Sequence, residues 1–424
     1  MASSNKITLE RIDHAFFRRR KTGFTAEATE FAELFSNSPS PRPPRLGGEP
    51  SEGDLHDHQI ADMMIGVRNM IEAADLRRGD QVLLLADTRS DKTTLEALTA
   101  GLRFFDAEPM TLVTEPIARY GAVPQAVLEA MHASDVVIWV WPVFITFTPA
   151  HRAMGRKREE SGSQLHEQRM KPYHIYFEGN AGLLARDYAK FPNKVLWKLA
   201  EKVREVVAAG KVVRLEDSLG TNLTATYDGK RLYGMQFRAG DPPGRCHFPW
   251  GRCGVFNGDG QANGQVYLSC VQGVAGRLAE PMRWKVKDSL ITEVDGGGEV
   301  GEECRRLFQE VPESNRLIEI MFGYHPKASA RHGIADPMHW ELISKMPWAG
   351  LGTPRKHPNF RHMDGSVFNA RLYIDDRLVV DTHGMLDRAL LHHPEVLEAA
   401  SEFGDPYKVL APVSHEAHGS GSTW

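Results

Sequence analysis

Short apolar runs alternate with helical patterns in the first third of the chain. Residues 82–86 are apolar and bounded by polar residues, which is typical of a strand buried on both faces. Residues 110–113 and 136–141 repeat the apolar run, and helical spacing occupies residues 93–104 and 123–131 between them. A strand–helix alternation of this kind predicts βαβ units and a parallel sheet with Rossmann-like layers.

The glycine-rich loops that bind nucleotides do not follow these strands. No G-x-G-x-x-G comes after any of the three apolar runs, and the chain contains neither the P-loop pattern nor the G-x-S-x-G nucleophile elbow. We therefore expect no nucleotide cofactor. The same observation disfavours the P-loop NTPase and serine hydrolase classes.

Beyond residue 210 the apolar period changes toward two. Residues 211–215, 222–227 and 265–271 are typical of strands, and residues 374–380 predict a tight hairpin. This change of period predicts a boundary between an α/β domain and a strand-rich α+β domain. We expect three parts, which are an N-terminal helical extension with a Pro-rich linker (1–57), an α/β domain (58–210) and a strand-rich metal-binding domain (211–424).

Composition narrows the classes of partner. The chain carries 51 basic and 55 acidic side chains and a net charge of −4, whereas nucleic-acid-binding domains are usually basic. The longest apolar stretch, residues 136–145, falls far short of the ~20 residues that a spanning helix needs. The four cysteines form no C-x-x-C pair, which disfavours a zinc knot and fits a reducing compartment. We expect a cytoplasmic protein with no nucleic-acid or membrane partner.

The sharpest candidate for metal chemistry is His362-x-Asp364. On a strand, residues two apart point to the same face, so an imidazole nitrogen and a carboxylate oxygen would converge there, as a divalent metal requires. Glu319 is the candidate third ligand, because it lies in an apolar run and precedes a glycine-bearing turn. The alternative is that the H-x-D arises by chance and that Glu319 is a salt-bridged core residue.

Several other residues allow more than one interpretation. His325 follows Glu319 within the same segment and is either a metal ligand, a proton shuttle or an ordinary packed histidine. Trp250 and Arg252 either line a pocket or pack a turn, and Cys246 and Cys253 with the intervening histidine form a weaker candidate for a thiolate site.

Five short segments together resemble a known superfamily. The segments are Gly220-Thr-Asn-Leu223, Phe248-Pro-Trp-Gly251, Glu319-Ile-Met-Phe-Gly-Tyr-His-Pro-Lys-Ala328, Trp348-Ala-Gly-Leu-Gly352 and His362-Met-Asp364. With them, residues from about 210 to 385 resemble the second domain of the aminopeptidase T-type metallopeptidases and of their relatives, the 2,5-dihydroxypyridine 5,6-dioxygenases. Residues 60–150 resemble the α/β domain of the same proteins more loosely.

Departures from the peptidase pattern favour the dioxygenase branch. The peptidases carry a Glu at the position of Arg252 and a His at the position of Trp348, and neither substitute can hold a second metal ion. Glu319, His362 and Asp364 remain, which is enough for one ion. The dioxygenase branch also keeps a single iron with the H-x-D pair, although its third ligand is a His at the position of Glu319.

The resemblance implies a mononuclear, extradiol-type ring-cleaving dioxygenase that uses dioxygen on a hydroxylated aromatic or N-heterocyclic compound. Fe(II) is the implied metal, with Mn(II) and Zn(II) as alternatives, and the enzyme is expected to be a homo-oligomer. The alternatives are a metal-dependent hydrolase or aminopeptidase and a non-catalytic binding protein with a degenerate site. The assigned residues are His325 and Arg361 for catalysis, and Trp250, Arg252, Tyr324 and Trp348 for substrate binding.

Overall fold

The structure is a computed structural model of the chain. It describes residues 52–74, 76–117, 123–143, 173–177, 179–229, 232–233, 245–248, 251–256, 261–272, 275–311, 314–328, 364–367, 370–381 and 386–412. None of the helices in these ranges is long and apolar enough to cross a membrane.

A five-stranded parallel sheet organises the first half, in the order β2-β1-β3-β4-β8. Helices α3 and α4 cover the face with Leu84, while α5 covers the face with Leu83 and Leu85. The two faces are covered because β1 is apolar on both sides, as its sequence predicts. The elements are β1 (Gln81–Asp87), β2 (Glu108–Thr114), β3 (Val136–Val140), β4 (Tyr173–Phe177), β8 (Arg245–Phe248), α3 (Glu52–Ala73), α4 (Lys92–Phe104) and α5 (Gln125–Ala133).

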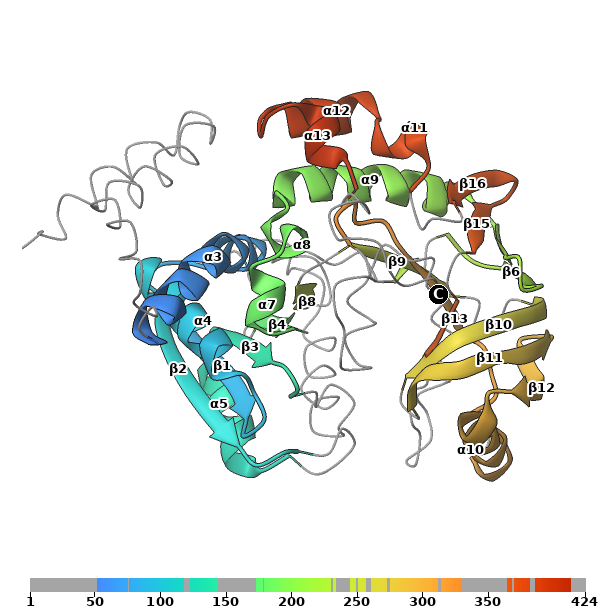
Figure 1. Cartoon of the computed structure of the whole chain (residues 1–424), viewed down its shortest axis with the longest axis horizontal. Helices are drawn as coiled ribbons and strands as arrows, with labels where there is room; N and C mark the ends of the chain where they lie inside the picture. The colour runs from blue at the N-terminus through green and yellow to red at the C-terminus, as the bar shows by residue number, and fades with distance from the viewer. Residues whose placement is uncertain are drawn as a thin grey trace, which may run out of the picture.

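An antiparallel sheet forms the framework of the second half, on the right of Figure 1. Its path runs β12-β11-β10-β6-β5-β15-β16, and β14 pairs with β10. The expected parallel sheet followed by a strand-rich region is therefore confirmed. The strands are β5 (Val212–Glu216), β6 (Asn222–Thr226), β10 (Ala262–Gln272), β11 (Ala275–Lys287), β12 (Leu290–Gly296), β14 (Asp364–Ser366), β15 (Arg371–Ile374) and β16 (Arg377–Val380).

A smaller sheet of three strands has the order β13-β9-β7. Its members are β7 (Leu232–Tyr233), β9 (Arg252–Phe256) and β13 (Glu319–Gly323), all antiparallel to their neighbours. β8 ends only a few residues before β9 begins, so the carboxyl edge of the parallel sheet leads directly into this small sheet.

Two elements near residue 210 join the half on the other side of the expected boundary. β8 lies beyond that position in the chain but pairs with β4 in the parallel sheet. Helix α9 (Asn193–Ala209) lies before it, yet its buried side chains, among them Leu199 and Val203, belong to the core of the second half. Sequence periodicity identifies α9 as a helix but does not show which sheet its apolar face covers.

Two asparagines fasten the halves together. The side-chain amide of Asn69 on α3 donates to the backbone oxygens of Ala189 and Phe191, at 2.9 and 3.0 Å. In return, the Asn193 amide at the start of α9 donates to the Asn69 backbone oxygen at 2.7 Å. The short helices α7 (Ala181–Leu184) and α8 (Asp187–Lys190) lie in this joint.

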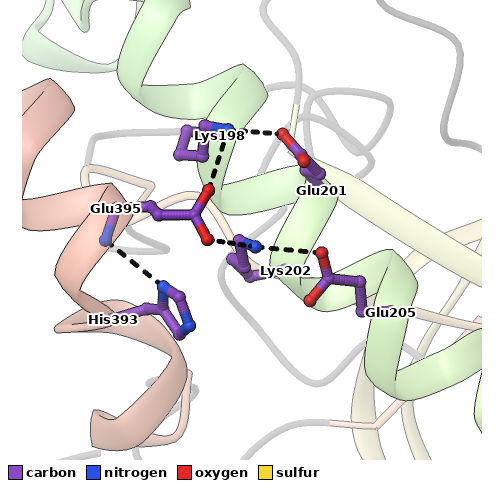
Figure 2. Close-up of polar contacts among 6 residues, drawn as sticks. All are labelled: Lys198, Glu201, Lys202, Glu205, His393 and Glu395. Atoms are coloured by element: carbon purple, nitrogen blue, oxygen red, sulfur yellow. Dashed lines mark hydrogen bonds and ion pairs between the residues drawn. The ribbon is translucent and has the colours of Figure 1, made fainter.

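The C-terminal helices pack on the outer side of α9 (Figure 1). They are α11 (Arg388–Leu391), α12 (Pro394–Ser401) and α13 (Pro406–Leu410), while α10 (Gly298–Glu310) packs on β11 and β12. Figure 2 shows how Glu395 of α12 joins two lysines of α9: its oxygens lie 2.7 Å from Lys202 Nζ and 3.1 Å from Lys198 Nζ.

Candidate metal-binding site

Strand β13 presents two different faces, because side chains alternate along a strand. Ile320 and Phe322 belong to the hydrophobic core of the second half, and their cross-strand partners on β9, Val255 and Cys253, belong to the same core. The other face therefore carries the alternate residues of both strands. This second face contains the candidate metal ligand Glu319.

The second face is buried but polar. Glu319 is 3% exposed and Arg252 is 7% exposed. Along the sheet, the Met321–Gly254 pair lies between the pair that contains Glu319 and the pair that contains Arg252. Paired residues share a face, so the pairings Met321 with Gly254 and Gly323 with Arg252 put all of these residues on the same side as Glu319. A buried carboxylate needs compensation by a charge, hydrogen bonds or a metal.

Gly254 makes room for the Glu319 carboxylate. Any Cβ at position 254 would lie 3.3 Å from Glu319 Oε1 and only 2.6 Å from Met321 Cγ. One oxygen of the Glu319 carboxylate therefore lies close to Gly254, which is a diagonal neighbour of Glu319 on the sheet. Sequence reasoning did not single out Gly254; a glycine within a strand pattern is the signal that would have indicated a close approach.

Arg252 is the nearest cationic position on this face of β9. It lies two residues from Gly254, roughly 7 Å along the strand, and is 7% exposed. The face therefore holds a buried guanidinium as well as a buried carboxylate.

His325 continues the chain just beyond β13 and is 1% exposed. Its ring lies edge-on against Tyr188, with centroids 4.3 Å apart, and against Phe191 at 4.9 Å. Gly251 packs closely against it, since a Cβ there would come within 2.4 Å of His325 Cβ. The histidine thus lies where the α8 segment meets the end of β13.

Tyr324 lies on the core side. It is 1% exposed, belongs to the hydrophobic core of the second half, and its backbone N–H donates to the Gly251 oxygen at 2.7 Å. Its side chain therefore packs in the core, and its role in substrate binding stays a prediction.

The H-x-D pair is described only at its second residue. Asp364 begins β14, and its backbone pairs with Gln272 of β10. Val367, which follows the end of β14, belongs to the same core as Ile320. Four of the predicted site residues lie outside the described ranges: Trp250, Trp348, Arg361 and His362. Within the described ranges no three His, Cys, Asp or Glu side chains are grouped to hold a metal, and His362 of the predicted set lies outside those ranges.

Cys253 is fully buried on the core side of β9. Burial raises the pKa of its thiol to about 12, so the neutral thiol is the form present at neutral pH. A metal-binding thiolate at this position is therefore disfavoured.

Comparison with known proteins agrees with this architecture. The sequence profile of the 2,5-dihydroxypyridine 5,6-dioxygenase (NicX) family matches residues 62–328, well over half of the chain. The matched range includes Arg252, Glu319 and His325 and ends before His362. Curated proteins give no significant match.

Two solved structures share the fold. A 2,5-dihydroxypyridine dioxygenase from Pseudomonas putida KT2440 superposes with a TM-score of 0.56 at 16% identity, covering 78% of this chain and 98% of its own. Wild-type AmpT from Thermus thermophilus superposes with a TM-score of 0.50 at 12% identity, covering 78% of this chain and 99% of its own.

The parallel sheet and the strand-rich second half give the chain the two-part fold that these two solved structures share. The chain belongs to the 2,5-dihydroxypyridine 5,6-dioxygenase family. The expected dioxygenase branch is confirmed.

Proposed function

We propose that the protein is a mononuclear non-haem dioxygenase that opens the ring of a hydroxylated N-heterocycle such as a dihydroxypyridine. The observation that carries the proposal is the family match over residues 62–328, which includes the strand bearing the buried Glu319. The solved relative named as a 2,5-dihydroxypyridine dioxygenase supports the same reading through its fold.

Glu319, His362 and Asp364 are the proposed metal ligands. The fit of a cation at Glu319 is supported by the burial of its carboxylate, because a buried carboxylate needs a compensating charge or hydrogen bonds. One imidazole and two carboxylates form a hard, anionic donor set that suits Fe(II) or Mn(II) and is also compatible with Zn(II). When bound, Fe(II) supplies the Lewis acidity and redox chemistry that ring cleavage by dioxygen requires.

The remaining residues have proposed roles around the substrate. Arg252 lies on the Glu319 face and pairs with a phenolate or carboxylate of the substrate. Trp250 and Trp348 stack on the ring, and His325 and Arg361 hold or move protons at its oxygens. Cytoplasmic location and a homo-oligomeric state stay predictions.

The test combines metal analysis with oxygen uptake. Purified protein is loaded with Fe(II) under anaerobic conditions, its iron content is measured, and oxygen consumption is followed against hydroxypyridines and dihydroxybenzoates. We expect one iron per chain and turnover of a dihydroxypyridine with loss of the aromatic absorbance. Asp364→Ala should lose both iron and turnover, whereas Asp376→Ala, an exposed aspartate in the β15–β16 turn, should keep both.

Two other outcomes would contradict the proposal. Release of leucine from a peptide with Zn(II), without oxygen consumption, would indicate a hydrolase, the activity class suggested by the likeness to AmpT. Failure of the wild-type protein to retain any metal after iron loading would indicate a binding protein with a degenerate site.

A further inference from the structure

Lys327 lies in the turn that follows β13, two residues after His325. Its backbone N–H and its side-chain ammonium both donate hydrogen bonds. Its backbone N–H donates to His325 Nδ1 at 3.1 Å. Its side-chain ammonium donates to the Ala411 backbone oxygen at 2.6 Å and to the Lys408 oxygen at 3.4 Å. One residue therefore orients the imidazole and connects the turn to the C-terminal end of α13.

The ammonium is held by carbonyl oxygens rather than by a carboxylate. Burial lowers the pKa of Lys327, and the charge of Asp187 on α8 acts against that shift. A cation at the carboxyl end of a helix satisfies carbonyls that have no partner within the helix. The contact is thus a C-terminal helix cap supplied from a distant segment, the turn after the candidate metal strand.

A closed chain of contacts runs through this cap. Helix α13 packs on α12, and α12 is joined to α9 through Glu395, whose carboxylate binds Lys202 and Lys198 (Figure 2). Helix α9 packs on β9, and β9 pairs with β13. The C-terminal helices therefore support the His325 turn against the same strand that carries Glu319.

The hydrogen bond to Nδ1 fixes the chemical state of His325. A backbone N–H is always a donor, so Nδ1 must present its lone pair, and a neutral imidazole then carries its proton on Nε2. Binding a metal through Nε2 would require that proton to leave. Both ring nitrogens would then be deprotonated, and the ring would be an imidazolate anion. Of the roles considered from sequence, this geometry disfavours metal ligation and favours donation from Nε2–H.

We propose that Lys327 is a positioning residue that holds His325 as a neutral, Nε2-protonated hydrogen-bond donor, with the C-terminal helices as its anchor. The proposal rests on the proposed function for the identity of the reaction, but the state of the histidine is independent of it. The proposal depends on the hydrogen bond from the Lys327 backbone to His325 and on the contact of the Lys327 ammonium with the end of α13.

The experiment compares Lys327→Met and Lys327→Arg in the iron-loaded, full-length protein. Lys194→Met is the matched control, because Lys194 is a solvent-exposed lysine of α9 that pairs with Glu402 of the same C-terminal region. The readouts are kcat and KM for the dihydroxypyridine, iron content, the melting temperature, and 15N chemical shifts of the His325 ring, assigned by their loss in His325→Gln.

In the wild type we expect the ring shifts of a neutral Nε2–H tautomer, with or without iron. Lys327→Met should lower kcat roughly 10- to 100-fold with a smaller change in KM, keep its iron, and move His325 toward a mixture of tautomers. Lys327→Arg should recover much of the kcat, because a guanidinium also donates to helix carbonyls. Lys194→Met should match the wild type in every readout except a small change in melting temperature.

Two results would overturn the inference. One is a folded Lys327→Met protein with wild-type kcat and unchanged His325 shifts, which would reduce Lys327 to a structural contact. The other is a wild-type His325 that is protonated on Nδ1 or loses its Nε2 proton when iron binds. If the wild type does not turn over dihydroxypyridines at all, the proposed function fails, while the ring shifts of the three lysine variants still decide the role of Lys327.

Discussion

Single residues of β9 and β13 define the candidate site through small differences in size and charge. Gly254 leaves space, Glu319 uses that space for its carboxylate, and Arg252 places a positive charge on the same buried face. The adjacent positions Cys253 and Val255 face the core instead. The chemistry of the strand pair is therefore confined to one face, and the other face gives the pair its stability.

Gly254→Ala should weaken metal binding without unfolding the protein. The new methyl group would lie 3.3 Å from Glu319 Oε1 and 2.6 Å from Met321 Cγ, so the carboxylate and the methionine must both move. We expect roughly 10- to 100-fold weaker iron binding, as for other changes that disturb a ligand's orientation. Titration of the apoprotein with Fe(II) under anaerobic conditions measures this.

Gly182→Ala is the control for that variant, because its Cβ would meet only the end of the Asn180 side chain at 3.3 Å. Equal iron affinity in the two alanine variants would argue against a metal ligand at Glu319.

Helix α9 makes contacts on two sides. One side packs into the core of the second half, and the other side holds α12 through lysines that alternate with glutamates. Glu395 is the shared partner of Lys198 and Lys202, and the Lys202 side chain is 8% exposed. This ion-pair cluster fixes the C-terminal helices from which the Lys327 anchor is built.

The cluster should make the C-terminal helices sensitive to acid. Hydrogen bonds from Lys202 and Lys198 hold the pKa of Glu395 below its usual value. A carboxyl whose folded pKa is depressed stabilises the folded state above its unfolded pKa, and that contribution is lost as the pH falls through the folded pKa. We expect the wild-type melting temperature to fall more steeply below about pH 4.5 than that of Glu395→Gln.

At pH 7 the same Glu395→Gln variant should melt a few degrees below the wild type, and its difference from the wild type should shrink in acid and in high salt. Glu398→Gln, in the same helix, is the control. Parallel pH curves for wild type and Glu395→Gln would show that the cluster does not contribute to stability.

At the scale of the whole molecule, the two halves are interwoven rather than consecutive. β8 completes the parallel sheet from beyond residue 210, while α9 enters the second core from before it. The chain passes from the edge of one sheet to the strand pair of the candidate site between β8 and β9. The candidate site therefore lies where the chain passes from the parallel sheet of the first half to the strands of the second half.

Separation of the halves at residue 210 should produce an unstable N-terminal fragment. A fragment of residues 1–210 lacks β8 and exposes the apolar face of α9, including Val195, Leu199 and Val203, which are fully buried in the complete chain. We expect this fragment to aggregate or to bind a hydrophobic dye strongly. A monomeric fragment with a cooperative melting transition would show that α9 does not depend on the second half.

The sequence by itself determined the layers and several local features. The apolar runs predicted β1 and β3 because a strand covered on both faces must be apolar on both. The run at β2 also predicted a strand, although β2 lies at the edge of the sheet and Met110 and Val113 are exposed. The hairpin at residues 374–377 also follows locally: Asp375 adopts a φ of 51° there, which aspartate tolerates better than most residues. The run containing Glu319 predicted a buried carboxylate correctly, since Glu319 is 3% exposed.

Only the tertiary structure decided which of these residues meet. Gly254 and Glu319 are adjacent because of a register between strands more than sixty residues apart, and no local pattern encodes that register. The membership of α9 in the second core, the core placement of Tyr324 and the anchor of Lys327 on α13 have the same origin. Local propensity determines which segments become helices and strands, whereas long-range packing determines which of them lie side by side. The candidate site consists of residues from different segments, so it depends on long-range packing.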